Sequence, residues 1–217
     1  AFESFFGFRA FQEDEAFLYA YPDAGLDSCG DRAWDATDAC CRNFCGPAVD
    51  DSSYLESLID EISSELNVDA AQIFVAGQSA GGFMSYRMAC DHADKVAAIA
   101  SFAGATFNDP ERCQPPAPVH ILEVHGTADL SVPFEGGATT TPFPGARATV
   151  EQWAKYNGCS LDPPVEEPFE LLSQVLGKET RIVRYAKDCS PGGSAELWMI
   201  QGGDHISVFT KPQFTLS

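Results

Sequence analysis

A serine flanked by glycines is the residue in this sequence whose surroundings most clearly favour chemistry. Ser79 lies in the segment Gly77-Gln78-Ser79-Ala80-Gly81-Gly82, between an apolar run typical of a β-strand and a pattern typical of a helix. In a sharp strand-to-helix turn, glycines let the backbone segments approach closely and leave the serine hydroxyl exposed. We therefore expect Gly77, Gly81 and Gly82 to permit this approach and Ser79 to be a nucleophile.

An acid and a histidine follow the serine, each after a further apolar run. Asp129 ends the segment His125-Gly126-Thr127-Ala128-Asp129, and His205 follows Gly202-Gly203-Asp204 near the end of the chain. A histidine can take the serine proton, and a carboxylate fixes the imidazole tautomer and stabilises the imidazolium. The order serine, acid, histidine is one of the known triad orders, so the sequence predicts a catalytic triad.

The remaining candidates for these roles are expected to serve local structure. Asp204 is a rival acid, but neighbouring loop residues rarely face each other usefully, so we expect it to shape the histidine turn. No histidine precedes Ser79, which excludes a triad in the order histidine, acid, serine. We expect the other histidines to have structural roles. His120 and His125 should serve packing or local hydrogen bonding, and His92 should lie near a helix C-terminus, where a cation is favourable.

Six segments together resemble the polyhydroxybutyrate depolymerase-like esterases, from about Phe6 to His205. They are Tyr21-Pro22-Asp23, Val49-Asp50-Asp51, Gly77 to Met84, His125 to Asp129, Trp153-Ala154 with Asn157-Gly158-Cys159, and Gly202 to His205. The family consists of α/β-hydrolases related to secreted feruloyl and acetylxylan esterases. The resemblance implies an α/β fold, with a mostly parallel central sheet and helices on both faces, in a single domain spanning residues 1–217. It also implies nucleophile, acid and base roles for Ser79, Asp129 and His205, and makes the Ala80 backbone N–H an oxyanion donor.

One element of that family is missing from the sequence. The related esterases carry a His-Gly turn after an early strand, upstream of the segment that matches Tyr21-Pro22-Asp23, and it supplies the second oxyanion N–H. Here the only His-Gly pair, His125-Gly126, belongs to the acid turn. We therefore expect the N-terminal strands to be incomplete, with a central gap between strands at Phe17 to Tyr21 and Ile73 to Ala76.

The remaining elements alternate between strands and helices, as a parallel α/β sheet requires. Ser53 and Glu56 form a capping-box pattern that opens a helix. Its apolar positions follow the helical period at Tyr54, Leu55, Leu58, Ile59, Ile62 and Leu66. Buried strands are expected at Ile73 to Ala76, Ala97 to Phe102, Val119 to Val124, Arg181 to Tyr185 and Glu196 to Ile200. A helix at about Ala148 to Asn157 should end at Gly158.

Composition limits the partners. The chain has 217 residues and a net charge of −19, from 32 acidic and 13 basic residues. The basic residues are scattered, and phosphate binding needs a positive patch, so we expect no nucleic-acid partner. No run of 18 apolar residues and no basic-then-apolar leader is present, so the sequence predicts neither a membrane span nor a retained signal peptide.

Eight cysteines favour an oxidising compartment, so we expect a secreted or periplasmic protein with disulfides. Four of them cluster in one loop, with open connectivity: Cys29, Cys40, Cys41 and Cys45. Their spacing does not match a zinc site, and we expect no metal. By resemblance Cys159 pairs with Cys189, and Cys90 with Cys113 is a second expected pair.

Three loops rich in proline and glycine follow the strands that lead to the site: Asp27 to Pro47, Gly104 to Pro118 and Pro133 to Gly145. Such loops normally shape a cleft, and the residues expected to contact substrate there are Trp34, Gln78, Phe107 and Phe134, with Phe143 a further candidate.

The sequence thus predicts a serine ester hydrolase that works through an acyl-enzyme without a cofactor, on short-chain or hydroxyalkanoate esters. The first alternative is a feruloyl or acetylxylan esterase acting on plant polysaccharide. The second is a catalytically weak α/β-hydrolase domain kept for binding, because half of its oxyanion hole is unaccounted for.

Overall fold

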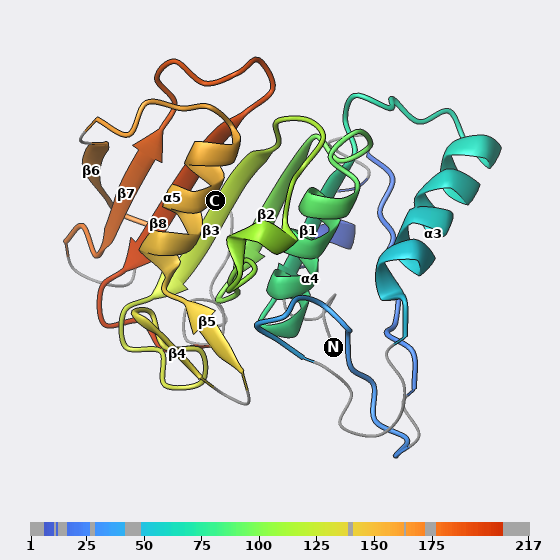
Figure 1. Ribbon diagram of the computed structural model, residues 1–217, viewed down its shortest axis with the longest axis horizontal. Helices are drawn as coiled ribbons and strands as arrows, with labels where there is room; N and C mark the ends of the chain where they lie inside the picture. Colours follow the sequence, from blue (N-terminus) through green and yellow to red (C-terminus); the bar gives the residue numbers. More distant parts are fainter. Residues whose placement is uncertain are drawn as a thin grey trace.

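A mostly parallel sheet forms the centre of the molecule in the computed structural model (Figure 1). The structure describes residues 7–10, 12, 17–26, 29–41, 49–138, 141–162, 164–171 and 177–205. Over these residues the sheet has six strands in the order β1-β2-β3-β8-β7-β6. Their bounds are β1 Phe74–Gln78, β2 Ala98–Phe102, β3 His120–Gly126, β6 Val165–Phe169, β7 Thr180–Tyr185 and β8 Ser194–Ile200. The pairs β1–β2, β2–β3 and β3–β8 are parallel, and β8–β7 and β7–β6 are antiparallel.

The strands expected from apolar runs are confirmed. All five correspond to β1, β2, β3, β7 and β8, with ends shifted by at most two residues. These strands could be recognised from apolar runs because their side chains are buried; Ile121, Leu197 and Met199, for example, lie in the core cluster. Sequence patterns did not predict β6, whose residues are all exposed, nor the hairpin of β4 Gly136–Ala138 and β5 Pro142–Pro144.

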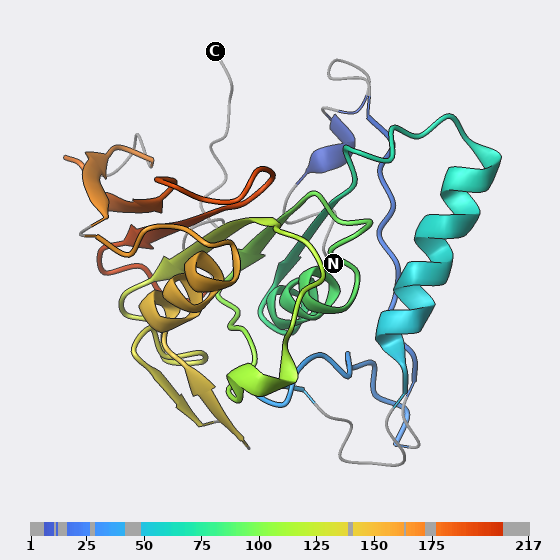
Figure 2. The same cartoon turned by 45° about the horizontal axis from the view of Figure 1, so that its top comes forward.

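Two helices lie against the same face of the sheet (Figure 2). Helix α4 (Ala80–Asp91) packs on β1 and β2, and α5 (Ala146–Tyr156) packs on β8 and β3. The long α3 (Asp51–Glu65) lies beside α4. The described residues also include two short 3₁₀ turns, η1 Phe8–Ala10 and η2 Pro110–Arg112. Helical cover of the second face stays a prediction.

The start of α3 differs from the capping-box prediction. Asp50 is the N-cap, and its carboxylate accepts hydrogen bonds from the Ser53 N–H (3.1 Å) and hydroxyl (2.7 Å). Glu56 instead accepts a hydrogen bond from Lys95, 2.8 Å away. Aspartate is as good an N-cap as serine, so the helix begins earlier than the pattern indicated.

The expected strand at Phe17 to Tyr21 is wrong. These residues form no regular element, and Leu18 and Tyr21 are more than half exposed. Strand β1 consequently forms an edge of the sheet as far as the structure describes it, with Phe74 65% exposed. This edge is the position at which the sequence predicts the central gap.

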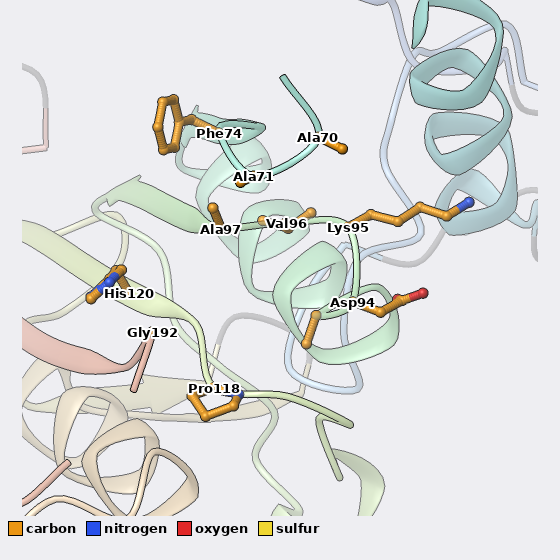
Figure 3. A pocket seen from close by; sticks show the side chains of 11 residues that line it. Ala70, Ala71, Phe74, Asp94, Lys95, Val96, Ala97, Pro118, His120 and Gly192 are labelled. Atoms are coloured by element: carbon orange, nitrogen blue, oxygen red, sulfur yellow. The ribbon is translucent and has the colours of Figure 1, made fainter. Parts of the chain in front are cut away.

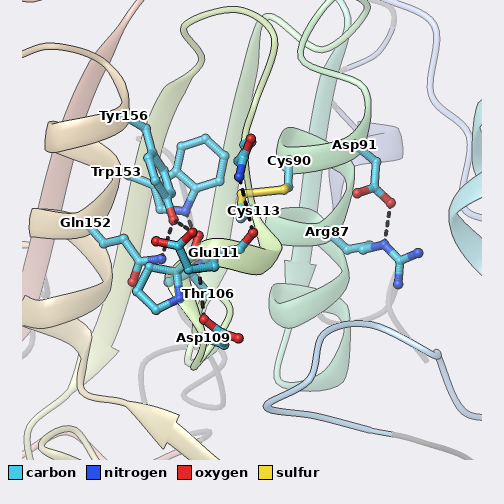
Figure 4. The surroundings of a disulfide bond; sticks show 12 residues. Arg87, Cys90, Asp91, Thr106, Asp109, Glu111, Cys113, Gln152, Trp153 and Tyr156 are labelled. Atoms are coloured by element: carbon cyan, nitrogen blue, oxygen red, sulfur yellow. Dashed lines mark hydrogen bonds and ion pairs between the residues drawn. A yellow bond between two sulfur atoms is a disulfide. The ribbon is translucent and has the colours of Figure 1, made fainter.

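Disulfides join elements that are distant in the sequence. Both expected pairs are confirmed: Cys90–Cys113 joins α4 to the segment after η2 (Figure 4), and Cys159–Cys189 joins the end of α5 to the β7–β8 connection. In the loop cluster Cys40 is bonded to Cys41, and Cys29 is also disulfide-bonded. Cys45 lies outside the described residues. None of the helices that the structure describes has the length and apolar character needed to cross a membrane.

Candidate active site

The three predicted triad residues follow three parallel strands. Ser79 comes directly after β1, Asp129 lies in the turn after β3, and His205 lies in the turn after β8. Carboxyl ends of parallel strands lie along one edge of a sheet, and ligands bind in the crevice outside that edge. The topology therefore places all three residues at the same edge.

The serine turn has the strained geometry of a nucleophile elbow. Ser79 has φ 53° and ψ −120°, a conformation that non-glycine residues rarely adopt, and it is the N-cap of α4. Its backbone N–H donates to the Phe102 carbonyl oxygen of β2 at 2.8 Å. The half-buried Ser79 is thus held at the sheet edge by backbone bonding.

The glycine prediction is correct at two of three positions. A Cβ at Gly77 would collide with the carbonyl of Gly81, and a Cβ at Gly82 would lie 2.7 Å from Ser101 Oγ. Gly81 itself has open space where a Cβ would be. The expectation for Gly81 is therefore wrong, because a side chain would fit at this position. It is the Gly81 backbone that lies against Gly77.

This asymmetry gives a matched pair of variants. Gly77→Ala should lower the free energy of unfolding by about 3 kcal/mol or more, because the new methyl group meets backbone that cannot move aside. Gly81→Ala should lose nothing and gain up to about 1 kcal/mol, since alanine favours the helix. Urea unfolding measures both values. Similar losses in the two variants would contradict the elbow geometry.

The acid is buried and held by backbone donors. Asp129 is 4% exposed, and its Oδ1 accepts the N–H groups of Ser131 (2.8 Å) and Val132 (2.9 Å). Its Oδ2 accepts a hydrogen bond from His205 Nδ1 at 2.7 Å. Burial by itself raises the pKa of Asp129, but hydrogen bonds from His125, His205 and the two N–H groups together hold it well below its usual range. Asp129 is therefore ionised at neutral pH.

The acid turn and the histidine turn are packed directly against each other. A Cβ at Gly126 would collide with the carbonyl of Gly203, and the Ala128 N–H donates to that same carbonyl at 2.8 Å. The amide of Gln78 donates to the His205 carbonyl oxygen at 3.1 Å. These contacts hold His205 between the serine strand and the acid.

The pairing favours the predicted acid. His205 Nδ1 contacts Asp129, which leaves Nε2 as the nitrogen that can accept a serine proton, while Asp204 is exposed. Among the bonds formed by the described residues there is none between the Ser79 hydroxyl and His205. Catalytic hydrogen bonds are often long without substrate and tighten when it binds.

The residues expected to contact substrate lie mostly in the core or are bound to other residues. Phe107 and Phe134 are 3% and 6% exposed and belong to the core, as does Phe143, so their expected contact with substrate stays a prediction. Packing of the proline- and glycine-rich loops onto the sheet turns these rings inward. Gln78 is bound to the His205 backbone, and Trp34 is half-buried against the core.

For the oxyanion donor, the position fits the expectation. The Ala80 N–H is the first of α4, and the first N–H groups of a helix have no intrahelical partner. Its role as donor stays a prediction.

Two residues near the acid were missed. Leu130 follows Asp129 directly and is 92% exposed, so it presents an apolar side chain next to the site. Glu123 lies within β3 and is fully buried, close to His125. The signal was present in the sequence, since a glutamate within an apolar strand run needs a partner when buried.

A pocket of about 320 Å³ lies away from the three predicted triad residues (Figure 3). Its lining includes Phe74 and His120, the first residues of β1 and β3, together with Lys95. It is therefore at the amino ends of the strands, opposite the edge that carries Ser79 and Asp129.

Known proteins that are similar in sequence to this chain are esterases. The sequence matches the phospholipase/carboxylesterase family over residues 48–161. It is 31% identical to feruloyl esterase B of Piromyces equi over 87% of this chain and 33% of that protein, and 29% identical to feruloyl esterase D of Neurospora crassa over 72% of this chain and 47% of that protein. The chain thus spans less than half the length of these relatives.

The fold is also similar to that of a solved enzyme. The acetyl xylan esterase from Aspergillus awamori superimposes with a TM-score of 0.61 at 15% identity, covering 96% of this chain and 80% of that one. At this identity the likeness shows the fold alone. With its family match over half of the sequence, this α/β-hydrolase chain belongs to the phospholipase/carboxylesterase family.

Proposed function

We propose that the chain is a serine carboxylic ester hydrolase that works through an acyl-enzyme. The observation that carries the proposal is the 2.7 Å hydrogen bond between His205 Nδ1 and Asp129 Oδ2, at the sheet edge where Ser79 has its strained conformation. Each group then has a chemical task that its surroundings support.

In the proposed reaction, Ser79 Oγ attacks the ester carbonyl carbon while His205 Nε2 takes its proton. Asp129 stabilises the resulting imidazolium, and the Ala80 N–H donates to the oxygen that gains negative charge. His205 then gives the proton to the departing alcohol, which leaves the acyl group on Ser79. Water attacks this ester by the same route, with His205 as base, and releases the acid.

For the substrate we propose esters of plant polysaccharide, with feruloyl esters first and acetyl esters second. Support comes from the feruloyl esterases of Piromyces equi and Neurospora crassa. The motif resemblance to polyhydroxybutyrate depolymerases makes hydroxyalkanoate esters the alternative class. A secreted location accords with the disulfides, which persist in oxidising compartments.

The test is a panel of four substrates: p-nitrophenyl acetate, methyl ferulate, acetylated xylan and hydroxybutyrate oligomers. We expect hydrolysis of p-nitrophenyl acetate, and kcat/KM for methyl ferulate at least about tenfold above that for hydroxybutyrate oligomers, a difference of roughly 1.4 kcal/mol in transition-state binding. The reverse ranking would favour the hydroxyalkanoate class. Absence of hydrolysis with all four would favour a binding domain.

A further inference from the structure

A chain of buried polar side chains leads from the acid into the core. Tyr86 on α4 and Glu123 on β3 are fully buried, and His125 at the end of β3 is 2% exposed. Tyr86 donates to Glu123 Oε2 at 3.0 Å, and His125 Nδ1 lies 3.0 Å from Glu123 Oε1. On its other side, His125 Nε2 lies 3.4 Å from Asp129 Oδ2. None of the acyl-transfer steps above uses these three groups.

The contacts of His125 decide its protonation state. Its Nε2 lies 2.8 Å from the Val132 carbonyl oxygen, which can only accept, so Nε2 carries a proton. Its Nδ1 faces a carboxylate oxygen of Glu123. If Glu123 is ionised, Nδ1 also carries a proton and His125 is an imidazolium.

The surroundings of Glu123 indicate the ionised form. Its oxygens accept hydrogen bonds from the Tyr86 hydroxyl at 3.0 Å and the Gly104 N–H at 3.3 Å, besides His125. Burial raises the pKa of Glu123 above its usual value, and hydrogen bonds from His125 and Tyr86 act against that increase. Donors on both oxygens are the arrangement that a buried carboxylate requires, and this geometry favours the ionised form.

The carboxylates on either side stabilise the charge on His125. Burial by itself lowers the pKa of His125, but the hydrogen bonds to Asp129 and Glu123 overcome it and raise the pKa to about 10. The rings of His125 and Phe134 form a T-shaped pair with their centroids 5.7 Å apart, and Tyr86 is hydrogen-bonded to Glu123. His205 is the next titratable group, and its Nδ1 contacts Asp129 Oδ2, the same oxygen that lies 3.4 Å from His125 Nε2.

We propose that His125 is a positioning residue of the esterase, a buried imidazolium that supplies counter-charge to the triad acid. Glu123 holds the imidazolium in place from the core side. Through the contact to Val132, His125 also closes the turn that carries Asp129. The proposal rests on the proposed function only for its catalytic consequence, because the charge state exists without substrate.

The sign of the effect on the base follows from electrostatics. His125 contacts Asp129 directly and Glu123 lies one contact further away, so the positive charge is nearer to His205. The base works with an unprotonated Nε2, and a neighbouring cation opposes the uptake of a further proton there. Loss of the His125 charge should therefore move the acidic limb of the pH–rate profile to higher pH.

The test is NMR on the intact chain with ¹⁵N-labelled histidine, which is practical because the chain has only four histidines. In the unmodified protein we expect both ring nitrogens of His125 to remain protonated at pH 8. Assignment of the other rings by His92→Gln, His120→Gln and His205→Ala identifies His125 by elimination. A neutral His125 ring at pH 7 would overturn the proposal whether or not the chain hydrolyses esters.

A variant of Glu123 then tests the charge on His125. Glu123→Gln removes the carboxylate on the core side, so the His125 ring should lose a proton at a pH more than roughly one unit below that of the unmodified protein. The control is His120→Gln, which replaces an exposed histidine at the other end of β3 and should leave the His125 titration unchanged. An unchanged His125 titration in Glu123→Gln overturns the proposal.

Kinetics give a second reading where the chain is active. His125→Gln should move the acidic limb of kcat/KM to higher pH and lower the plateau of kcat roughly tenfold, with little change in KM, because positioning and not binding is lost. The esterase assignment has its own test: if it is wrong, the Ser79→Ala substitution will not reduce activity. An unshifted limb with full kcat would refute the role of His125 and leave the triad intact.

Discussion

Ser79→Ala is expected to reduce kcat/KM for p-nitrophenyl acetate by roughly 10⁴-fold or more, because it removes the atom that attacks the ester. The loss of a half-buried hydroxyl should hardly change stability, and alanine relieves no strain at φ 53°. Steady-state kinetics measure the loss, and urea unfolding verifies that the fold persists.

A control and a labelling experiment make this result specific. Ser57→Ala removes an exposed hydroxyl from α3 and should retain full activity. A fluorophosphonate should label the unmodified protein once, at Ser79, and leave Ser79→Ala unlabelled. Retention of more than a tenth of the activity in Ser79→Ala would show that another residue is the nucleophile.

His205→Ala and Asp129→Asn are expected to lower kcat by roughly 10³- to 10⁴-fold each. The first change removes the base. The second keeps an oxygen that can accept the N–H groups of Ser131 and Val132, but it places an amide against His205 Nδ1 and so favours the wrong tautomer. Turnover of p-nitrophenyl acetate measures both variants, and fold is monitored by circular dichroism.

Asp204→Asn is the matched control for the acid. It makes the same chemical change one residue before His205, in an exposed side chain that does not occupy the Nδ1 contact. We expect kcat to stay within roughly threefold of the unmodified protein, as for a surface substitution away from the reacting groups. A greater loss in Asp204→Asn than in Asp129→Asn would mean that Asp204 is the acid.

The proposed triad has unequal structural support for its members. Asp129 has two backbone donors and two histidines around its carboxylate, and His205 is held through both its ring and its carbonyl. Ser79 is held through its backbone. Its N–H is hydrogen-bonded to Phe102, and the turn around it is tight because Gly77 has no Cβ to collide with Gly81. The hydroxyl itself is therefore the part of the site that substrate binding has to align with His205.

Sequence by itself determined the residues of the proposed triad and their order, because an exposed serine in a sharp turn needs glycine nearby and the acid and base follow buried strands. Five strands and α5 were readable for a related reason: continuous apolar runs and terminal signals such as Gly158 are local properties of the chain. The family resemblance likewise depended on short segments in a fixed order.

Tertiary structure alone decided which side chains meet. Asp204 adjoins His205 in the sequence and is exposed, while Asp129, distant in the sequence, contacts the imidazole. Burial of Phe107 and Phe134 depends on how loops pack onto the sheet, and the failure of residues 17–21 to form a strand depends on a neighbour with which to pair. The charge on His125 also depends on long-range packing, since Tyr86 and Asp129 come from different elements and meet around β3. Periodicity and spacing contain no information on these contacts.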